Sequence, residues 1–402
     1  MTNFNKTICV IGLGYIGLPT ASLLGTKGYK VHGVDTSKHV VDTISEGRIH
    51  IVEPDLDILV KSAVQSGNLT AGLEPRKADV FILAVPTPFK GDHQPDLSYV
   101  ETATRMIAPY VEAGNIIILE STSPVGTTED IVARILKDAG HDIDKDVFVA
   151  HCPERVLPGR ILTELVENDR IVGGVNKIAT EKAVEFYNTF VRGKVLVTDS
   201  RTAEMAKLTE NSFRDVNIAF ANELSLICDQ ENISVWELIA LANRHPRVNI
   251  LQPGPGVGGH CIAVDPWFIV ARAPKLSRLI RTAREVNDYK PDWVVDKVKR
   301  SANKFKRPVI GCLGLAFKAD VDDLRESPAV DIVRALISED IGQVLIAEPN
   351  LREHAEFELK PYEDVVSAAD IVLLLVDHKE FRDLRAESLK EKVLIDTRGV
   401  IV

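Results

Sequence analysis

Cys261 of this 402-residue chain directly follows a loop rich in glycine and proline, and its thiol could act as a nucleophile. Four glycines and two prolines occupy residues 253–260 directly ahead of Cys261, so neither a helix nor a central strand can form there. A thiol needs less activation than other nucleophilic side chains, because a small fraction is already thiolate near neutral pH. Asp265 follows four residues later and could assist. The alternative is a turn whose cysteine fills a small apolar hole.

A polar stripe precedes this loop. Residues 194–245 contain neither glycine nor proline, which predicts long helices, and Lys207, Asn211 and Arg214 would share one helix face. Such a stripe could be solvated surface. However, His245 and Arg247 add hydrogen-bond donors just before the cysteine loop. Together with the stripe they could form a binding site for an anion.

The opening of the chain has the pattern of a dinucleotide-binding fold. A strand over 7–11 leads into Gly12, Gly14 and Gly17, a helix follows over 18–26, and a second strand over 30–34 ends on Asp35. The glycines allow a pyrophosphate to approach the helix N-terminus, and Asp35 can accept hydrogen bonds from ribose hydroxyls. Because a carboxylate repels a 2′-phosphate, this pattern favours NAD over NADP.

Further apolar runs at 78–85 and 115–120 are typical of buried parallel strands. The turns after them contain Thr87 and Thr122, which become candidates for the cofactor side of the site, although both hydroxyls could instead cap helices. A strand over 146–150 leads to Glu154, a candidate general base, and Arg155, a candidate anion ligand. An ion pair bracing the loop is an equal alternative for these two. Cys152 is a second-ranked nucleophile because it lacks a glycine-rich approach.

The last third of the chain repeats the opening pattern, with strands expected over 308–314, 343–348, 369–376 and 392–397. Residues 317–328 are expected to open its first helix and to hold Lys318 and Arg325 near a strand end, as phosphate or sugar contacts or as capping and ion-pair groups. The predicted fold is α/β: a Rossmann-type dinucleotide domain (1–192), a central all-helical domain (193–300) and a C-terminal Rossmann-like domain of nucleotide-binding type (301–402), to which the family resemblance described below adds the nucleotide-sugar as ligand.

Composition excludes several classes of function. The net charge of −10 argues against a general nucleic-acid binder, and no apolar tract is long enough to span a membrane. Without a signal peptide, a cytoplasmic protein is expected. The five cysteines are widely spaced, so we expect free thiols and no metal site.

Six motifs, spread over essentially the whole chain, resemble those of a known family. They are GLGYIGLP at 12–19, VPTPF at 85–89, ESTSPVGTT at 120–128, CPERV at 152–156, AKLTENSFRDVNIAFANEL at 206–224 and GVGGHCIAVDP at 256–266. In these motifs the chain resembles the nucleotide-sugar 6-dehydrogenases. Residues 243–251 and the cysteine loop are most similar to the branch that acts on UDP-N-acetylmannosamine.

The resemblance implies a role for each matching residue. The catalytic set would be Cys261, Lys207, Asn211, Asp265, Glu154 and Thr122. The cofactor contacts would be Gly12, Gly14, Tyr15, Ile16, Gly17, Asp35, Thr87, Thr122 and Arg398, the last of these reaching the cofactor of a partner subunit. The sugar-nucleotide contacts would be Arg155, Val156, Lys207, Asn211, Arg214, His245, Arg247 and Gly258, to which the residue pattern adds Lys318 and Arg325.

The implied reaction is an NAD-dependent four-electron oxidation of the C6 hydroxymethyl group of a UDP-sugar, through a thiohemiacetal and a thioester on Cys261. The implied substrate is UDP-N-acetylmannosamine, with UDP-N-acetylglucosamine and UDP-glucose as alternatives. A homodimer or a dimer of dimers through the central domain, and a uronate product used for cell-surface polysaccharide, are also implied. Two other classes remain open: a two-electron hydroxy-acid dehydrogenase, and a sugar-nucleotide sensor without catalysis.

Overall fold

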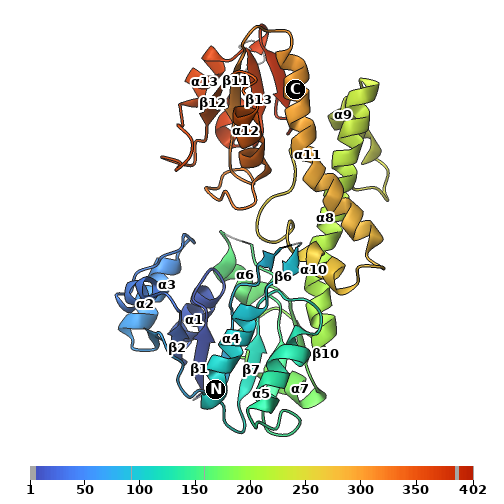
Figure 1. The fold of residues 1–402 in the computed structure, drawn as a ribbon. Coiled ribbons are helices and arrows are strands. Elements are labelled where there is room, and N and C mark those ends of the chain that lie inside the picture. Colours follow the sequence, from blue (N-terminus) through green and yellow to red (C-terminus); the bar gives the residue numbers. More distant parts are fainter. Residues whose placement is uncertain (1–5, 92, 158, 385–388, 402) are drawn as a thin grey trace. The chain divides into compact units, whose positions relative to one another are not determined.

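The computed structural model describes residues 6–91, 93–157, 159–384 and 389–401. The chain forms two compact units, which meet between Thr209 and Glu210. This boundary falls inside one long helix, α8 (Ser200–Glu231), shown in yellow-green in Figure 1. Each unit contains its own main sheet, as expected for two Rossmann-type domains.

The first unit is built on an eight-stranded sheet with the order β10-β9-β8-β7-β4-β1-β2-β3. The chain runs from β1 outward through β2 and β3 and then returns to place β4 on the other side of β1, which creates a topological switch point between β1 and β4. The strands are β1 (Thr7–Ile11), β2 (Lys30–Val34), β3 (Leu69–Gly72), β4 (Val80–Leu83), β7 (Ile116–Leu119), β8 (Phe148–His151), β9 (Arg170–Gly174) and β10 (Val195–Asp199).

Apolar residues on both faces of the central strands explain why they form a covered sheet. Along β4, Ile82 enters one hydrophobic core while its neighbours Phe81 and Leu83 enter the other. Helices pack over the two faces, and a short hairpin of β5 (Phe89–Lys90) and β6 (Gln94–Pro95) follows β4. These helical segments are α1 (Gly17–Thr26), α2 (Lys38–Ser45), α3 (Leu56–Gln65), α4 (Ser98–Ile107), η1 (Ala108–Tyr110), the π-helical η2 (Thr128–Ala133), α5 (Arg134–Asp138), α6 (Ile161–Glu167) and α7 (Lys177–Tyr187).

The far edge of this sheet differs from the sequence prediction. Strand β9 pairs antiparallel with β8, and β10 continues parallel to β9, so two of the eight strands run against the other six. Strand β10 also occupies the start of the segment for which helices were expected, because Val195, Leu196 and Val197 favour a strand when a sheet edge is available. The long helix begins only at Ser200.

The second unit combines helices with a four-stranded parallel sheet of order β12-β11-β13-β14. Its strands are β11 (Val309–Leu313), β12 (Gln343–Ala347), β13 (Ile371–Leu374) and β14 (Val393–Asp396). Besides the second part of α8, its helices are α9 (Val235–Ala242), α10 (Asp265–Arg272), α11 (Arg278–Ala302), α12 (Pro328–Ser338), α13 (Tyr362–Ala368) and the 3-10 turn η3 (Lys379–Asp383).

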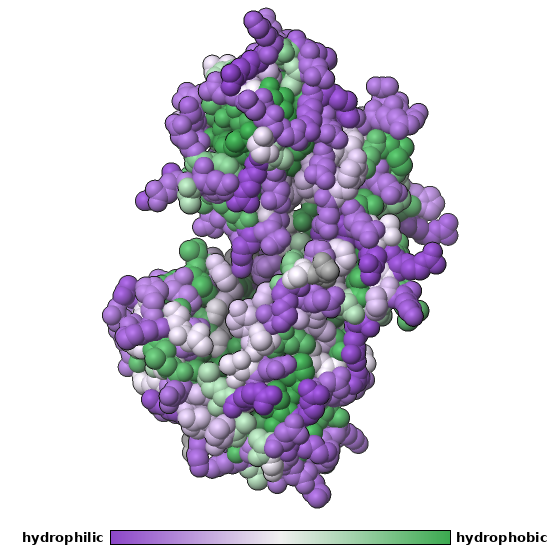
Figure 2. Space-filling model, viewed as in Figure 1, coloured by the Kyte–Doolittle hydropathy of each residue, from purple (hydrophilic) through white to green (hydrophobic). Residues whose placement is uncertain are grey.

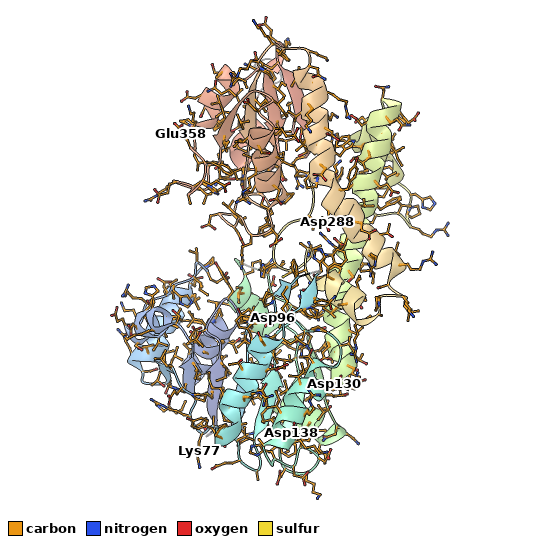
Figure 3. The ribbon with its side chains drawn as sticks, viewed as in Figure 1. Lys77, Asp96, Asp130, Asp138, Asp288 and Glu358 are labelled. Atoms are coloured by element: carbon orange, nitrogen blue, oxygen red, sulfur yellow. The ribbon has the colours of Figure 1, made fainter. Side chains whose placement is uncertain are left out.

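A buried polar seam joins α8 to α11. Arg284 Nη1 lies 2.7 Å from Asp215 Oδ1, and both side chains are almost completely buried. The Asn287 amide also donates to Asp215, and Arg284 pairs with Asp288, which Figure 3 labels on α11. Burial raises the pKa of Asp215, although Arg284 opposes the rise. Removing one member of such a buried pair costs about 3–5 kcal/mol, so this seam fixes how the two helices pack.

The segment before α12 also differs from its prediction. Residues 317–327 form turns and loop, and α12 begins only at Pro328. Proline suits the first turn of a helix and disfavours helical backbone in the residue before it, so the helix cannot start earlier. The Ser327 hydroxyl instead donates to the Leu315 carbonyl at 2.6 Å, which closes the loop at its base.

Hydrophilic side chains cover most of the face drawn in Figure 2, with smaller apolar areas between them. Among the described residues, no helix is both long and apolar enough to cross a membrane. The five cysteines are free thiols, as expected, and only Cys261 is more than slightly exposed.

Candidate active site

The three glycines after β1 have different structural roles. A Cβ at Gly12 would lie 2.6 Å from the Ala84 carbonyl oxygen, and a Cβ at Gly17 would lie 1.8 Å from the Gly12 carbonyl oxygen. By contrast, a Cβ at Gly14 would have nothing within 4 Å. Gly12 and Gly17 therefore allow the tight turn itself, whereas Gly14 borders open space at the N-terminus of α1, where a pyrophosphate can approach.

Asp35 follows β2 at the same edge of the sheet. Its Oδ2 accepts a hydrogen bond from the Leu13 N–H at 3.1 Å, and its Oδ1 accepts one from the Ser37 N–H at 2.9 Å. A carboxylate has about four acceptor positions, so Asp35 can still accept hydrogen bonds from a ribose diol. Tyr15 is exposed beside this turn, and Ile16 is the N-cap residue of α1. The glycine turn and Asp35 thus fit NAD.

The turns after β4 and β7 lie together. The Thr87 hydroxyl donates to the Thr122 carbonyl oxygen at 2.5 Å, and the Ser121 hydroxyl donates to the Val85 carbonyl oxygen at 2.6 Å. Thr87 is therefore a link between two loops rather than a helix cap. Both loops follow strands that flank the switch point or neighbour it, which is where such sheets bind ligands.

Glu154 lies in a buried ionic cluster that the sequence did not reveal. Its Oε2 accepts a hydrogen bond from Arg170 Nη1 at 3.0 Å, and its Oε1 accepts one from the Arg155 N–H at 2.6 Å. Arg170 is almost fully buried. Burial alone would lower the pKa of its guanidinium, but the combined attraction of Glu154, Cys152, Glu120 and Tyr187 raises this pKa above its ordinary value. The only sequence signal for Arg170 was a cation at the start of the apolar run 171–175.

Two further groups of this cluster have shifted pKa values. Burial raises the pKa of Glu120 to about 7, with Arg170 opposing the rise, and the Tyr187 hydroxyl donates to Glu120 Oε1 at 2.7 Å. Burial raises the pKa of Cys152 to about 12. A thiol with that pKa is inert near neutrality, which supports the lower rank given to Cys152 as a nucleophile. The neighbouring Arg155 donates to the Asp169 carbonyl, and Val156 packs against the hydrophobic core.

Helix α8 presents the predicted stripe. Lys207 is half-buried, Asn211 is buried and Arg214 is exposed. The Asn211 amide donates to Asp265 Oδ2 at 2.5 Å, although 54 residues separate the two. Asp265 is buried at the start of α10, and its N–H donates to the Cys261 carbonyl oxygen at 2.8 Å. The structure therefore connects the polar face of α8 with the turn that carries the candidate nucleophile.

The glycines ahead of Cys261 pack against the segment 317–328 of the same unit. A Cβ at Gly258 would lie 2.4 Å from the Glu326 carbonyl oxygen, and one at Gly256 would lie 2.8 Å from Pro328 Cβ. Gly259 has φ = +82°, and its N–H donates to the Arg325 carbonyl oxygen at 3.0 Å. These glycines are required for close packing of the chain against itself, a reason that the sequence alone did not supply.

The remaining candidates lie on loops of the second unit. Lys318 is exposed, and the Arg325 guanidinium forms a two-oxygen pair with Asp323, with the shortest contact at 2.6 Å. His245 and Arg247 are exposed in the turn after α9. Arg398 Nη2 lies 2.8 Å from Asp377 Oδ1, and its guanidinium lies beside Gly254 at the start of the cysteine loop.

Three family models match the chain in succession. They are the NAD-binding domain (residues 6–191), the central domain (201–289) and the UDP-binding domain (311–402) of the UDP-glucose/GDP-mannose dehydrogenase family. The three ranges follow the order of domains expected from the sequence.

Individual relatives match over nearly the whole length. An NDP-N-acetyl-D-galactosaminuronic acid dehydrogenase from Ralstonia solanacearum is 58% identical over 98% of this chain and 96% of its own. A UDP-N-acetyl-D-mannosamine dehydrogenase from Yersinia pestis is 54% identical over 98% and 99%. The solved structure of a UDP-N-acetyl-mannosamine dehydrogenase from S. aureus superposes with a TM-score of 0.91 at 46% identity, covering 98% of this chain and 95% of that chain.

Proposed function

The chain belongs to the UDP-glucose/GDP-mannose dehydrogenase family, and from this premise we propose that it oxidises the C6 hydroxymethyl group of UDP-N-acetylmannosamine to a carboxylate. NAD is the cofactor. The substrate proposal is supported by relatives of that name at 53–55% identity over nearly the full length. UDP and the sugar would be held by Arg155, Val156, Lys207, Asn211, Arg214, His245, Arg247, Gly258, Lys318 and Arg325.

The observation that carries this proposal is the chain of contacts from Asn211 through Asp265 to the backbone of Cys261. A two-electron dehydrogenase or a sensor has no need for a thiol held in this way. An enzyme that oxidises an alcohol to an acid does, because the aldehyde must be retained between two oxidations. The buried amide–carboxylate bond fixes the turn and thereby the position of the thiol.

Different residues would carry out the proton transfer from the C6 hydroxyl and the covalent capture of the aldehyde. Lys207 would take the proton of the C6 hydroxyl, directly or through water, and Asn211 would stabilise the oxygen as charge develops. The Cys261 sulfur would add to the aldehyde carbon to form a thiohemiacetal, which the second oxidation turns into a thioester. NAD, when bound, accepts one hydride at each oxidation, so two NAD are used per sugar.

Hydrolysis of the thioester would break the carbon–sulfur bond and return the thiol. We assign the attacking water to Thr122, Glu154 and Asp265. Each oxygen of Glu154 already accepts one hydrogen bond from the protein, which leaves about one acceptor position on each oxygen for water. Arg170 would act here as a positioning residue, since it holds the Glu154 carboxylate in place.

A second substrate is favoured by a specific finding. Two relatives named NDP-N-acetyl-D-galactosaminuronic acid dehydrogenase have 58% and 59% identity, slightly more than the relatives named for N-acetylmannosamine. A nucleotide-linked N-acetylgalactosamine is therefore the second candidate. UDP-N-acetylglucosamine and UDP-glucose rank lower.

A panel of UDP-sugars tests the proposal. NADH and the product acid would be measured for UDP-linked N-acetylmannosamine, N-acetylgalactosamine, N-acetylglucosamine and glucose. We expect two NADH and one uronate per sugar consumed, with the highest kcat/KM for UDP-N-acetylmannosamine. A yield of one NADH per sugar would contradict the four-electron reaction. An equal kcat/KM for UDP-glucose would contradict the assignment of UDP-N-acetylmannosamine as the substrate.

We further propose a homodimer, or a dimer of dimers, that forms through the central domain. On α8 the side chains of Phe213, Phe220 and Ile227 are each more than half exposed, and their spacing of seven residues places them on one stripe of the helix. A second copy of this stripe would bury it, and Arg398 would then reach the partner's cofactor site. A fully active monomer in sedimentation at micromolar concentration would contradict the dimer.

The domain limits 1–192, 193–300 and 301–402 remain our proposal, supported by the ranges of the three family models. We also propose a cytoplasmic location and a use of the uronate in cell-surface polysaccharide, both in line with an enzyme that uses NAD and a nucleotide-sugar.

A further inference from the structure

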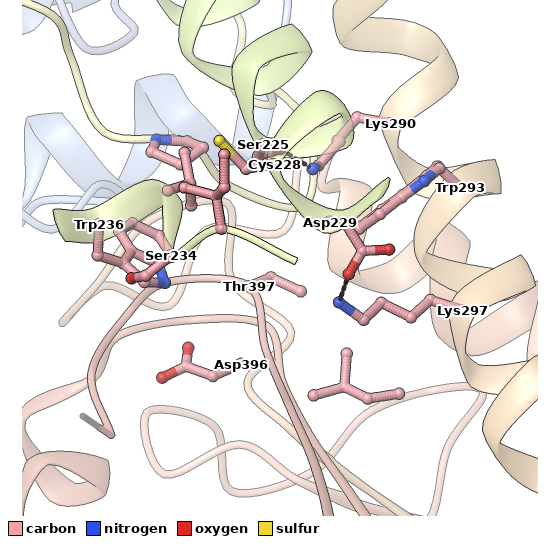
Figure 4. A pocket seen from close by; sticks show the side chains of 14 residues that line it. Ser225, Cys228, Asp229, Ser234, Trp236, Lys290, Trp293, Lys297, Asp396 and Thr397 are labelled. Atoms are coloured by element: carbon pink, nitrogen blue, oxygen red, sulfur yellow. Dashed lines mark hydrogen bonds and ion pairs between the residues drawn. The ribbon is translucent and has the colours of Figure 1, made fainter. Parts of the chain in front are cut away.

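A cavity of about 160 Å³ lies in the second unit, and none of the residues that line it is assigned to the reaction. It is lined by the end of α8, the start of α9, the helix α11 and the end of β14. Figure 4 shows Lys290, Trp293 and Lys297 entering from α11, with Ser225 and Asp229 on α8 and Trp236 on α9. The rest of the lining is mixed: Ile233, Val235, Pro253 and Ile395 are apolar, whereas Ser234, Asp396 and Thr397 are polar.

Lys290 is the unusual member of this wall. Its side chain is only 3% exposed, and its Nζ donates to the Ser225 hydroxyl and lies 4.2 Å from the centre of the Trp293 ring. Among the described residues, no carboxylate lies within ion-pair distance of Lys290. An ammonium group has three donors, so at least one of them points to no acceptor in the chain. A buried cation of this kind calls for an anion.

The other charged groups around the cavity already have partners. Asp229 pairs with Lys297 and lies 3.7 Å from Arg300. Asp396 accepts backbone hydrogen bonds from the four residues 398–401, at 2.7–2.8 Å. Burial, reinforced by Lys297, lowers the pKa of Lys290 to about 7, with Asp229 opposing the shift. Protonated Lys290 is therefore the one charged side chain of the lining whose charge is met by neither an opposite charge nor several hydrogen bonds.

We propose that this cavity is a binding site for a small carboxylate that carries a ring, with the carboxylate on Lys290 Nζ and the ring against the indoles of Trp293 and Trp236. The size agrees, because a cavity of about 150 Å³ is known to hold benzene. A free phosphate fits less well, since its larger negative charge would lie near the carboxylates of Asp229 and Asp396, which also line the cavity. The site is independent of the proposed reaction.

Benzoate is a suitable probe, and benzamide is its uncharged counterpart of nearly the same shape. Two of the three tryptophans of the chain line the cavity, so binding to the full-length protein can be followed by tryptophan fluorescence and checked by calorimetry. We expect saturable binding of benzoate and binding of benzamide weaker by about tenfold or more, as for the loss of one charged hydrogen bond. This comparison requires no variant. Equal binding of the two compounds, or no binding of benzoate, would overturn the proposal.

Protein variants locate the site. Lys290→Met keeps the length of the side chain and removes the charge, and it should reduce the affinity for benzoate to that for benzamide. Lys304→Met removes an exposed charge just beyond the end of α11 and should leave the affinity unchanged. An equal loss in both variants would show a general charge effect and overturn the site. Displacement of benzoate by UDP would place it in the substrate site and would also overturn the proposal.

The pH dependence gives an independent readout. Lys290 loses its proton as pH rises through about 7. The other titratable groups that line the cavity are Asp229, which pairs with Lys297, Asp396, which accepts backbone hydrogen bonds, and Cys228. We expect benzoate to bind about tenfold more tightly at about pH 6 than at about pH 8, with no such change in Lys290→Met. An affinity that is the same at both pH values would contradict the role of Lys290.

Discussion

The two main sheets of this chain begin with the same elements, but the acid that follows the neighbouring strand has a different role in each. Each has a glycine with positive φ after its first strand, Gly12 at +90° and Gly314 at +94°, and an acid after the neighbouring strand. Asp35 is half-buried and accepts two backbone hydrogen bonds. Glu348 is 4% exposed and accepts hydrogen bonds from backbone N–H groups at Leu315, Ala316 and Asn350 and from His378.

Asp35 and Glu348 differ in how many hydrogen-bond acceptor positions of the carboxylate remain free. His378 Nδ1 accepts from the Asp320 N–H, so its Nε2 carries the proton and donates to Glu348 at 3.1 Å. Burial alone would raise the pKa of Glu348, but the hydrogen bonds from His378 and Leu315 hold it below its ordinary value. Glu348 is thus saturated by its own domain, while Asp35 retains positions for a ligand. In this chain, the acid that keeps free acceptor positions is the one in the NAD-binding domain.

The helices after the two glycine turns differ in the same sense. Helix α1 begins at Gly17, directly after its turn, whereas α12 begins only at Pro328. The intervening loop of the second domain packs on the cysteine loop instead of exposing a helix N-terminus. The second domain therefore supports the loop of the nucleophile, whereas the first binds the cofactor. This difference in role can be tested.

The largest effect is expected at Cys261. Cys261→Ala should retain binding of NAD and of the sugar nucleotide but lower the overall four-electron oxidation by about 10⁴-fold or more, as for the loss of a covalent nucleophile. NADH and uronate in a single turnover measure this, and mass spectrometry should detect a sugar adduct on the native enzyme only. Cys152→Ala is the matched control and should remain active, since its thiol is buried with a pKa near 12. Normal yields of two NADH and one uronate from Cys261→Ala would return this cysteine to a structural role.

The paired acids test the comparison directly. Glu348→Ala should lower the free energy of unfolding by about 3 kcal/mol, because it leaves buried donors without an acceptor, and should not change the KM for NAD. Asp35→Ala should do the reverse: the KM for NAD should rise by about tenfold and approach that for NADP, with little loss of stability. Urea unfolding and initial rates measure the two effects. If the native enzyme used NADP as well as NAD, Asp35 would not be the ribose ligand.

A third acid at a strand end, Glu120, should give a pH-dependent effect. Because burial raises the pKa of Glu120 to about 7, the folded chain binds this proton more tightly than the unfolded chain, and stability falls as pH rises from about 4.5 to about 7. Glu120→Gln keeps an acceptor for Tyr187 and should be more stable than the native chain by on the order of 2–3 kcal/mol at about pH 8. At about pH 4 the difference in urea unfolding should disappear. An equal difference at both pH values would contradict this account.

The smallest effect is expected at Lys38. Lys38 is the first residue of α2, three residues after Asp35, but it is exposed and pairs with Asp42 at 2.6 Å. Lys38→Ala should change stability by less than about 0.5 kcal/mol and the KM for NAD by less than about twofold. A tenfold rise in KM would assign Lys38 to the cofactor.

The sequence predicted the central strands well because their residues are apolar on both faces, a pattern with few alternative explanations. It placed β1 and β2 at their observed limits and β4, β7 and β11 to β14 within two residues at each end. It failed at β10 and at the start of α12, where the outcome depends on a sheet edge and on a proline. Local propensity is weak in such places, and tertiary contacts decide.

The site shows the same limit. The glycine turn and Asp35 are contiguous enough to be recognised from spacing. By contrast, the bond between Asn211 and Asp265 and the pair of Glu154 with Arg170 join residues far apart in the chain, and only the fold brings them together. Resemblance to a family named three of these four residues and omitted Arg170, because a buried partner contacts neither substrate nor cofactor.

The packing of the cysteine loop on residues 317–328 has a consequence for modularity. The family models match the chain in separate ranges, with the central match ending at 289 and the last one starting at 311. Yet Gly258 and Gly259 leave no room for a side chain against Glu326 and Phe317, which belong to the last match. A chimera that exchanges the C-terminal domain must therefore take both sides of this contact from one parent. Recombination between relatives, in the laboratory or in evolution, is constrained to inherit the two segments together.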